Sequence, residues 1–224
     1  MARLASQAKM GYFPTPESVL ALIKNMIEIE GDPAWYAVFD PCCGTGEFTR
    51  AMPDGVRTYG NDLDEERYQM AKQNVDQVLF GDALFDIKTT HAAYSCLYLN
   101  PPYDWTQDIK GESVRVEKLF LESTAKYLKR KGLLILIIPK EALAHCAKSL
   151  SYHYKKIQVF PFPDKEFEAF DQLVVFGYRG NRIDDEMTNR LCTIGNWPTW
   201  REDLPLKKLD EAAATEKLTM PASK

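Results

Sequence analysis

The sequence predicts an α/β domain in which an open, mostly parallel sheet of seven strands is covered by helices on both faces. Three observations indicate this class. Short apolar runs alternate with amphipathic stretches, as they do where strands alternate with helices. The run from Leu133 to Ile138 is apolar at every position, which is typical of an interior parallel strand. Clusters of glycine, proline, asparagine and aspartate follow most apolar runs and indicate turns.

The first half of the chain carries the clearest pattern. Pro16 opens a stretch whose apolar residues recur at helical spacing as far as Ile27, and a Gly-Asp-Pro break follows it. An apolar strand then ends at Asp40, before a tight glycine-containing loop. The same order of strand, turn and helix is repeated further along the chain. We expect helices over residues 16–27, 47–52 and 64–75, and strands over residues 37–40, 58–62, 78–80 and 96–99.

The second half begins with a polar segment over residues 104–112, which is expected to be a loop. A helix over residues 114–129 follows, with Lys131 and Gly132 at its end, and a further helix is expected over residues 141–150. Strands are expected over residues 133–138, 154–160 and 173–178. The sequence becomes polar after Gly180. We therefore expect a domain over residues 1–180 and a partly flexible C-terminal extension over residues 181–224, with its last dozen residues mobile and no second folded domain.

Composition excludes several classes of protein. The 28 basic and 32 acidic residues give a net charge of −4, which argues against a surface that binds nucleic acid all over. The longest apolar run is far below the ~20 residues that a bilayer requires, so no membrane partner is expected. The N-terminus lacks the apolar core of a signal peptide, which favours the cytoplasm. The five cysteines contain no CxxC pair and the three histidines are scattered, which indicates reduced thiols and no metal site.

Three loops that follow strands have the composition of a cofactor site. The first is Asp40-Pro41-Cys42-Cys43-Gly44-Thr45-Gly46, whose glycines let the backbone pass close to a ligand. The second ends at Asp62, where a carboxylate can accept hydrogen bonds from a ribose diol. The third is Gly81-Asp82, where a carboxylate can accept from the amino group of an adenine ring. In open α/β sheets such loops meet at the carboxyl ends of the strands. Each loop alone also fits an ordinary tight turn.

The fourth loop, Asn100-Pro101-Pro102-Tyr103, follows an apolar strand and indicates amine chemistry. Two prolines fix the chain and remove two donors, so neighbouring carbonyls are left to accept. The Asn100 oxygen and the Pro101 carbonyl can both accept from one amino group, which makes its lone pair available. Tyr103 can stack on a planar ring, a contact worth about 1–3 kcal/mol per base. The alternative is a rigid turn with a surface tyrosine.

Together these loops resemble the motifs of class I S-adenosylmethionine-dependent methyltransferases, and more narrowly those of DNA adenine-N6 methyltransferases of the gamma arrangement. In that group a short segment that binds the methionine end of the cofactor precedes the glycine loop, and Gly11 to Pro16 fits it. The resemblance covers roughly residues 10–180. It implies a Rossmann-like fold, S-adenosyl-L-methionine as cofactor, and direct transfer of a methyl group to the N6 amino group of adenine in DNA. It implies no metal and no covalent enzyme intermediate.

The resemblance also implies roles for individual residues. Asn100 and Pro101 hold the target amino group, Pro102 completes the rigid loop, and Tyr103 stacks on the flipped base. A second aromatic wall is expected from Phe167 or Phe170. The proline–cysteine pair at Cys42 also occurs as the nucleophile of cytosine-C5 methyltransferases, but its place in the cofactor loop makes it a packing residue here. The implied cofactor contacts are Tyr12, Phe13, Thr15, Asp40, Pro41, Cys42, Gly44, Gly46, Asp62, Asp82, Ala83 and Asn100.

Basic residues in two groups are candidates for holding DNA. Lys110, Arg115 and Lys118 follow the Asn100 loop on the expected substrate side. Lys155, Lys156, Arg179 and Arg182 are candidates for lining a groove, whereas Lys129 to Lys131 fit the solvated end of a helix at the opposite edge. A solvated scatter of charge is the alternative for each group. The short chain after Gly180 leaves no recognition domain, so we expect low sequence specificity or a partner subunit that supplies recognition.

Two alternative functions remain open. The Asn-Pro-Pro-Tyr loop also occurs in enzymes that methylate RNA bases or a protein glutamine amide, because amine activation is common to all of them. Only about 39 residues precede Asp40, which leaves little room for the helical domain typical of the glutamine enzymes. The other alternative is a non-catalytic subunit with the same fold. The retained Asp62, Asp82, Asn100 and Tyr103 argue against it.

Overall fold

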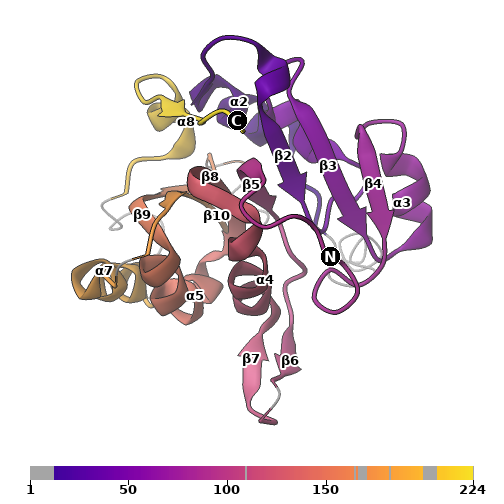
Figure 1. Cartoon of the computed structure of the whole chain (residues 1–224). Helices are drawn as coiled ribbons and strands as arrows, with labels where there is room; N and C mark the ends of the chain where they lie inside the picture. Colours follow the sequence, from indigo (N-terminus) through magenta and orange to yellow (C-terminus); the bar gives the residue numbers. More distant parts are fainter. Residues whose placement is uncertain are drawn as a thin grey trace.

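The computed structural model describes residues 13–108, 110–163, 165, 171–181, 183–198 and 206–223. Within these residues, seven strands form one sheet in the order β4-β3-β2-β5-β8-β10-β9 (Figure 1). β10 is antiparallel to both of its neighbours, and the other pairs are parallel. The predicted open, mostly parallel sheet is therefore confirmed. Its strands are β2 (Ala37–Asp40), β3 (Arg57–Asp62), β4 (Gln77–Phe80), β5 (Tyr94–Leu99), β8 (Leu128–Pro139), β9 (Tyr154–Pro161) and β10 (Gln172–Arg179).

Helices cover both faces of the sheet because its central strands are apolar on both sides. Along β8, Leu133, Ile135 and Ile137 point into one core layer, and the alternate residues of the same run point into the other. The first layer is closed by α2 (Glu17–Met26), α3 (Glu65–Ala71) and α8 (Leu209–Ala213). The second layer is closed by α4 (Val116–Thr124), α5 (Lys140–His153) and α7 (Asp185–Gly195). The expected helix over residues 47–52 is a 3-10 helix, η3 (Glu47–Ala51).

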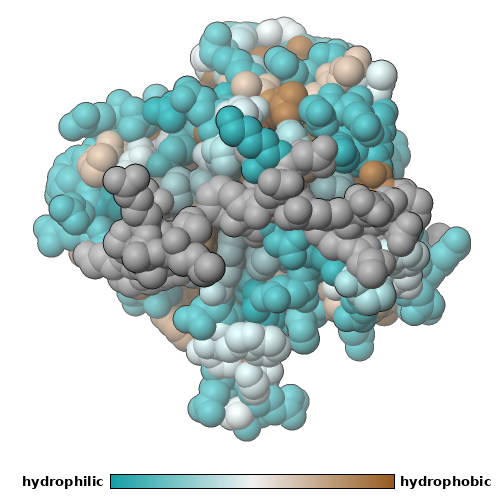
Figure 2. Space-filling model, turned by 180° about the vertical axis from the view of Figure 1, so that it is seen from behind, coloured by the Kyte–Doolittle hydropathy of each residue, from teal (hydrophilic) through white to brown (hydrophobic). Residues whose placement is uncertain are grey.

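The segment after the Asn100 loop differs from the prediction. In place of a loop over residues 104–112, β6 (Trp105–Gln107) and β7 (Ser113–Arg115) form an antiparallel hairpin in which Trp105 pairs with Arg115. The hairpin projects from the body of the domain at the bottom of both Figure 1 and Figure 2. Its β6 residues are all exposed. These two strands pair with each other and not with the apolar sheet, so their sequence is polar. A polar sequence of this kind is indistinguishable from a loop.

The helix expected over residues 114–129 is also shorter than predicted. α4 ends at Thr124, one 3-10 turn follows in η4 (Ala125–Tyr127), and β8 starts at Leu128, which pairs with Tyr94 of β5. Lys129 to Lys131 therefore lie in a strand and not at a helix end. The pairing with β5 supplies backbone hydrogen bonds to this segment, an effect that the helical spacing of its apolar residues does not reveal.

The C-terminal extension is part of the core and not a loose tail in the residues that are described. β11 (Leu218–Thr219) pairs with β1 (Ile27–Glu28), and Met220 is fully buried. Ser223 Oγ accepts a hydrogen bond from Ala37 N at 2.9 Å. Figure 1 shows this yellow C-terminal segment beside α2. Residues 199–205 lie outside the description.

Two further properties bear on the class of protein. No helix in the described ranges is long and apolar enough to cross a membrane. The same ranges contain no group of three His, Cys, Asp or Glu side chains that could hold a metal ion.

Candidate active site

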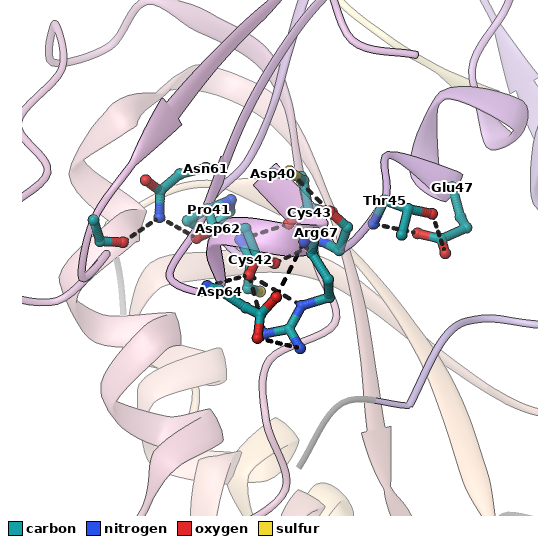
Figure 3. Close-up of polar contacts among 12 residues, drawn as sticks. Asp40, Pro41, Cys42, Cys43, Thr45, Glu47, Asn61, Asp62, Asp64 and Arg67 are labelled. Carbon is teal, nitrogen blue, oxygen red and sulfur yellow. Dashed lines mark hydrogen bonds and ion pairs between the residues drawn. The ribbon is translucent and has the colours of Figure 1, made fainter. Parts of the chain in front are cut away.

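The four loops singled out in the sequence lie together at one edge of the sheet. β2, β3, β4 and β5 are parallel, and the order β4-β3-β2-β5 places their carboxyl ends side by side. Asn61, at the end of β3, ties two of these loops together. Its Nδ2 donates to Pro41 O and to Gly81 O, both at 3.0 Å, and the residue is 1% exposed (Figure 3). The sequence predicts the loops but not this link, because its two acceptors are each 20 residues from Asn61.

Asp62 is the centre of a hydrogen-bond cluster (Figure 3). Its Oδ2 accepts from Gly44 N at 2.9 Å, and its Oδ1 accepts from Asp64 N at 2.9 Å. Arg67 donates to Oδ1 from Nε at 3.0 Å and forms an ion pair with it through Nη2. The carboxylate thus lies beside the glycine loop, where a ribose diol would reach it. Arg67 is a site residue that sequence reasoning missed, although its place on the first turn of the following helix is a usable signal.

The glycine loop is shaped by steric and hydrogen-bond constraints. Gly46 has φ +92°, and a Cβ at this position would lie 2.8 Å from Val75 Cγ2. Asn74 donates to Thr45 O at 2.8 Å from the other side of the loop. Thr45 in turn donates through its hydroxyl to Glu47 at 2.7 Å. A non-glycine residue at position 46 is therefore excluded by both conformation and space.

Asp82 and Ala83 complete the edge on the β4 side. Asp82 is partly exposed, and its Oδ1 accepts from Leu84 N at 2.8 Å, which closes a local turn. Ala83 is buried next to it. Together with Asp62 and the glycine loop, these residues form the set of carboxylates and close backbone that fits the ribose and adenine of a nucleoside cofactor.

Asp40 is buried at the centre of the first loop, and Cys42 beside it is half-buried. Asp40 accepts from Cys42 N at 2.9 Å and is 2% exposed. Burial raises the pKa of Asp40 well above that of an ordinary carboxyl. Burial, together with the neighbouring Asp40, also raises the pKa of the Cys42 thiol well above its usual value. The thiol is therefore protonated at neutral pH, which agrees with its interpretation as a packing residue and not a nucleophile.

Asn100 connects the start of the chain to the fourth loop. Its Nδ2 donates to Phe13 O at 2.7 Å and to Thr15 Oγ1 at 3.2 Å. Thr15 is buried and also shares a 2.9 Å hydrogen bond with the Tyr98 hydroxyl. Because the amide nitrogen donates in these contacts, the amide oxygen is left as the acceptor of the side chain, with two lone pairs. The structure thus brings Phe13 and Thr15 to Asn100. Tyr12 lies outside the described residues.

Tyr103 closes this group from the other side. Its hydroxyl donates to Asn100 Oδ1 at 2.7 Å, and its ring stacks on Phe13 with centroids 5.3 Å apart and an angle of 10°. Gln172 donates from Nε2 to the Tyr103 hydroxyl. Burial raises the pKa of Tyr103, so the phenol remains a donor at neutral pH. Gln172 is a second residue that sequence reasoning missed. It is 1% exposed at the start of β10, and nothing in the local sequence marks it as a partner of Tyr103.

Arg115 does not have the place predicted for a DNA contact. It is 5% exposed, and it forms ion pairs with Glu117 at 2.5 Å and with Glu141 at 3.1 Å. Its guanidinium also lies over the Trp105 ring, 5.3 Å from the centroid. Burial raises the pKa of Glu117, although Arg115 acts in the opposite sense. The charge of Arg115 is thus matched inside the protein, which makes it a structural residue that holds the hairpin to α4 and α5.

The other predicted substrate residues differ from one another in their placement. Lys110 is exposed in the turn of the hairpin, where its backbone nitrogen donates to Asp108 Oδ1 at 2.8 Å. Its side chain is therefore free to meet a ligand from solvent. Phe167 and Phe170, the predicted second aromatic wall, lie outside the described residues.

Comparison with curated proteins finds two similar chains from Methanocaldococcus jannaschii. The methylase subunit of type I restriction enzyme MjaIX is 26% identical over 110 residues, which are 42% of this chain and 19% of that protein. The methylase subunit of type I restriction enzyme MjaVII is 28% identical over 134 residues, which are 51% of this chain and 23% of that protein. The matches thus cover about a fifth of the length of these relatives.

Comparison with solved structures supports the fold. The methyltransferase subunit of a type I restriction-modification system from Streptococcus thermophilus superimposes with a TM-score of 0.55 at 17% identity. The match covers 92% of this chain and 57% of that structure. A likeness at this identity establishes the class I methyltransferase fold.

A family model matches most of the chain. Residues 1–196 match the model of an uncharacterised methyltransferase family, DUF6094. This range includes all four loops and both strands that flank the Tyr103–Gln172 contact. The chain therefore belongs to the DUF6094 methyltransferase family, with the class I fold and S-adenosyl-L-methionine as its cofactor.

Proposed function

We propose that this protein methylates the N6 amino group of adenine in DNA. The observation that carries the proposal is the orientation of Asn100 at the end of β5. Its amide nitrogen is committed to Phe13 O and Thr15 Oγ1, so its amide oxygen is the acceptor, and the Tyr103 hydroxyl uses one of the two lone pairs of that oxygen. The type I restriction methylase subunits that the chain resembles support DNA as the substrate.

The chemistry assigned to the loop is activation of a conjugated amine. Asn100 Oδ1 and the Pro101 carbonyl accept the two hydrogens of one amino group, and this draws the nitrogen lone pair out of conjugation. S-adenosylmethionine would supply the methyl group. The N–CH3 bond would form as the sulfonium S–CH3 bond breaks, S-adenosylhomocysteine would leave, and the methylated amine would lose one proton to solvent. The rigid Pro101-Pro102 backbone fixes both acceptors before the substrate binds, so the contribution of the protein is positioning and electrostatics.

Tyr103 is assigned to the flipped base, and its present neighbours indicate how a base would enter. The Phe13 ring stacks on Tyr103 at 5.3 Å, in the place that an extruded base would use. We infer that Phe13 moves aside when a base enters, so that one stacking contact replaces another. Extrusion from a duplex costs a few kcal/mol, and stacking of about 1–3 kcal/mol per base offsets part of it.

The cofactor contacts follow from the other three loops. Asp62 is assigned to the ribose, Asp82 with Ala83 to the adenine, and the loop from Asp40 through Pro41 and Cys42 to Gly44 and Gly46 to the methionine end. Thr15 and Phe13 close the pocket beside Asn100. Because Asp62 Oδ1 is engaged by Arg67 and Asp64, its Oδ2, next to Gly44 N, is the better placed oxygen for a ribose hydroxyl.

The test of the proposal is transfer of labelled methyl groups to DNA, RNA and protein by the full chain. We expect label in DNA as N6-methyladenine. Asn100→Ala should lower kcat by about 10²- to 10³-fold, the cost of losing one preorganised polar contact to a reacting group. Asn189→Ala, at an exposed position on α7, is the matched control and should leave kcat unchanged.

Four outcomes would contradict the proposal. Label found only in protein would favour a glutamine amide as substrate, and label found only in RNA would favour an RNA base. Binding of S-adenosylmethionine by calorimetry with no transfer to any of the three would favour a non-catalytic subunit. An Asn100→Ala variant with unchanged DNA methylation would remove the loop from the mechanism.

We further propose that a partner subunit selects the DNA sequence. The similar proteins from Methanocaldococcus jannaschii are named as subunits, and the chain matches about a fifth of their length. Methylation mapping on genomic DNA treated with this chain alone should then show methylated adenines without a consensus. A defined motif under these conditions would show that the chain itself reads sequence.

A further inference from the structure

A cleft of about 780 Å³ lies among the ends of three strands of the sheet and the segment that contains β11. We call it the basic cleft, because its lining includes five cationic side chains from four separate segments. The chain as a whole has a net charge of −4, so this is a local concentration of positive charge. Its cationic residues are Lys131, Lys155, Lys156, Arg179 and Lys217.

The basic cleft is separate from the candidate active site. Lys131 lies near the start of β8, whereas Pro139, at the other end of the same strand, pairs with Gln172 beside Tyr103. The eight residues from Lys131 to Pro139 span roughly 26 Å at about 3.3 Å per residue. The two sites therefore lie at opposite ends of the sheet, and one does not include residues of the other.

The hydrogen bonds described for Arg179 and Lys217 in the basic cleft leave their charge in place. No carboxylate is among the described residues that line it. Arg179 donates from Nη1 to His153 O and Gly180 O, both at 3.1 Å, and Lys217 donates to Asn25 O at 2.6 Å. These acceptors are uncharged, so they orient the cations without neutralising them. Glu216, which accepts from Gln158 of the lining, is itself paired with Lys207 at 3.1 Å.

Two of the cations are held in a strained backbone conformation. Lys131 has φ +63° and Lys156 has φ +51°, in the left-handed region that glycine and asparagine favour. A residue that keeps a long charged side chain at such a position gives up backbone stability. Strain of this kind gathers at sites that bind ligands. Both residues lie where the strand pairing shifts register, Lys131 in the pairing of β8 with β5 and Lys156 in that of β9 with β10.

We propose that the basic cleft binds the sugar–phosphate backbone of nucleic acid, away from the reacting base. The choice of nucleic acid over other polyanions rests on the proposed function. The pairing of positive charge near the candidate active site favours this choice. There Arg115 is neutralised, and Lys110 in the hairpin turn lies between Asp108 and Glu112. In the cleft, by contrast, Lys156 and Lys217 are both exposed and no carboxylate is among the described lining residues. A partner protein with an acidic segment is the alternative occupant.

The experiment is DNA binding by the full chain, measured by fluorescence anisotropy of a labelled duplex at several salt concentrations. The variant is Lys156→Gln with Lys217→Gln, two exposed cations of the cleft. Loss of two phosphate contacts should reduce the slope of log K against log salt by about 1.8, and should weaken binding by about 10- to 100-fold at 0.1 M salt. Lys156→Arg with Lys217→Arg should restore both.

Matched controls separate this site from general charge effects and from catalysis. Lys72→Gln with Lys88→Gln removes the same charge from exposed positions beside β4, at the far side of the sheet, and should leave the slope unchanged. The cleft variant should keep the kcat of methyl transfer at saturating DNA and its affinity for S-adenosylmethionine.

The outcomes distinguish this inference from the proposed function. An unchanged salt slope in the cleft variant overturns the cleft as a phosphate site, while methylation by the wild type still supports the proposed function. A reduced slope in a protein that never methylates DNA supports the cleft and contradicts the proposed function. Binding of polyglutamate that matches or exceeds that of DNA, and that is lost in the same variant, would instead assign the cleft to an acidic protein.

Discussion

The two ends of the sheet differ in the sign and the accessibility of their charge. At the carboxyl ends of β2, β3 and β4, Asp40, Asp62 and Asp82 surround the glycine loop. The cations nearby are engaged, since Arg67 pairs with Asp62. At the other end, the basic cleft contains cations and no carboxylate in the lining that the structure describes. The same fold thus presents an anionic pocket for a small molecule at one end and a cationic surface at the other.

The difference has a physical reason. The sulfonium of S-adenosylmethionine is a cation, so carboxylates around its pocket favour it. The same carboxylates repel phosphates, and within about 10 Å at ordinary salt this repulsion is only partly screened. Phosphate-binding charge placed roughly 26 Å away, at the far end of β8, escapes it. Separation of the two ends lets one small domain serve two ligands of opposite charge.

The largest expected effect is a loss of stability on replacing Arg115, because Arg115 is a structural cation and not a DNA contact. Arg115→Ala leaves Glu117, which is fully buried, without its partner. We expect the free energy of unfolding in urea to fall by about 3–5 kcal/mol. The double variant Arg115→Met with Glu117→Leu should recover most of it. A normal stability with a reduced salt slope for DNA would instead make Arg115 a phosphate contact.

A variant of Gln172 tests the contact between two uncharged side chains, Gln172 and Tyr103, at the active-site end of the sheet. Gln172→Leu removes the donor to the Tyr103 hydroxyl, and kcat should fall by about 5- to 10-fold with the KM for S-adenosylmethionine unchanged. Tyr103→Phe should have a similar effect, and the double variant should lose no more than either single one. A Gln172→Glu variant donates only when its carboxyl is protonated, so its activity should rise as the pH falls. Additive losses would show that Gln172 acts independently of Tyr103.

The smallest expected effect is on the pH dependence of stability, and it comes from the buried side chain of Asp40. Because burial raises its pKa, the folded protein holds this proton more tightly than the unfolded chain does. Stability contributed by Asp40 is therefore greatest near pH 4 and is lost as the pH rises towards the raised pKa. Asp40→Asn should be less sensitive to pH than the wild type in urea unfolding between pH 4.5 and 7.5. A wild type whose stability changes with pH just as the variant does would contradict this assignment.

The parts of the molecule that the sequence predicts are those in which local pattern decides structure. The seven strands follow from short apolar runs, and the loop at Asn100 follows from two prolines that no neighbour can override. Gln172 was not predicted, because its partner Tyr103 is 69 residues away and a single glutamine carries no local signal. Arg115 was misassigned for the same reason. Its charge is visible in the sequence, but its pairing with Glu141 depends on how α5 packs.

The contacts at Ser223 have a consequence for how the protein is made. The hydrogen bond from Ala37 N joins residues 186 positions apart, and β11 pairs with β1 at the end of the first helix. During synthesis, the core layer beneath α2 stays open until the segment from Leu209 to Ser223 has left the ribosome. Until then the side of α2 that packs on α8, and the edge of β1 that pairs with β11, are uncovered. Emergence of this segment, and not the appearance of the catalytic loops, therefore sets the moment at which this core layer can close.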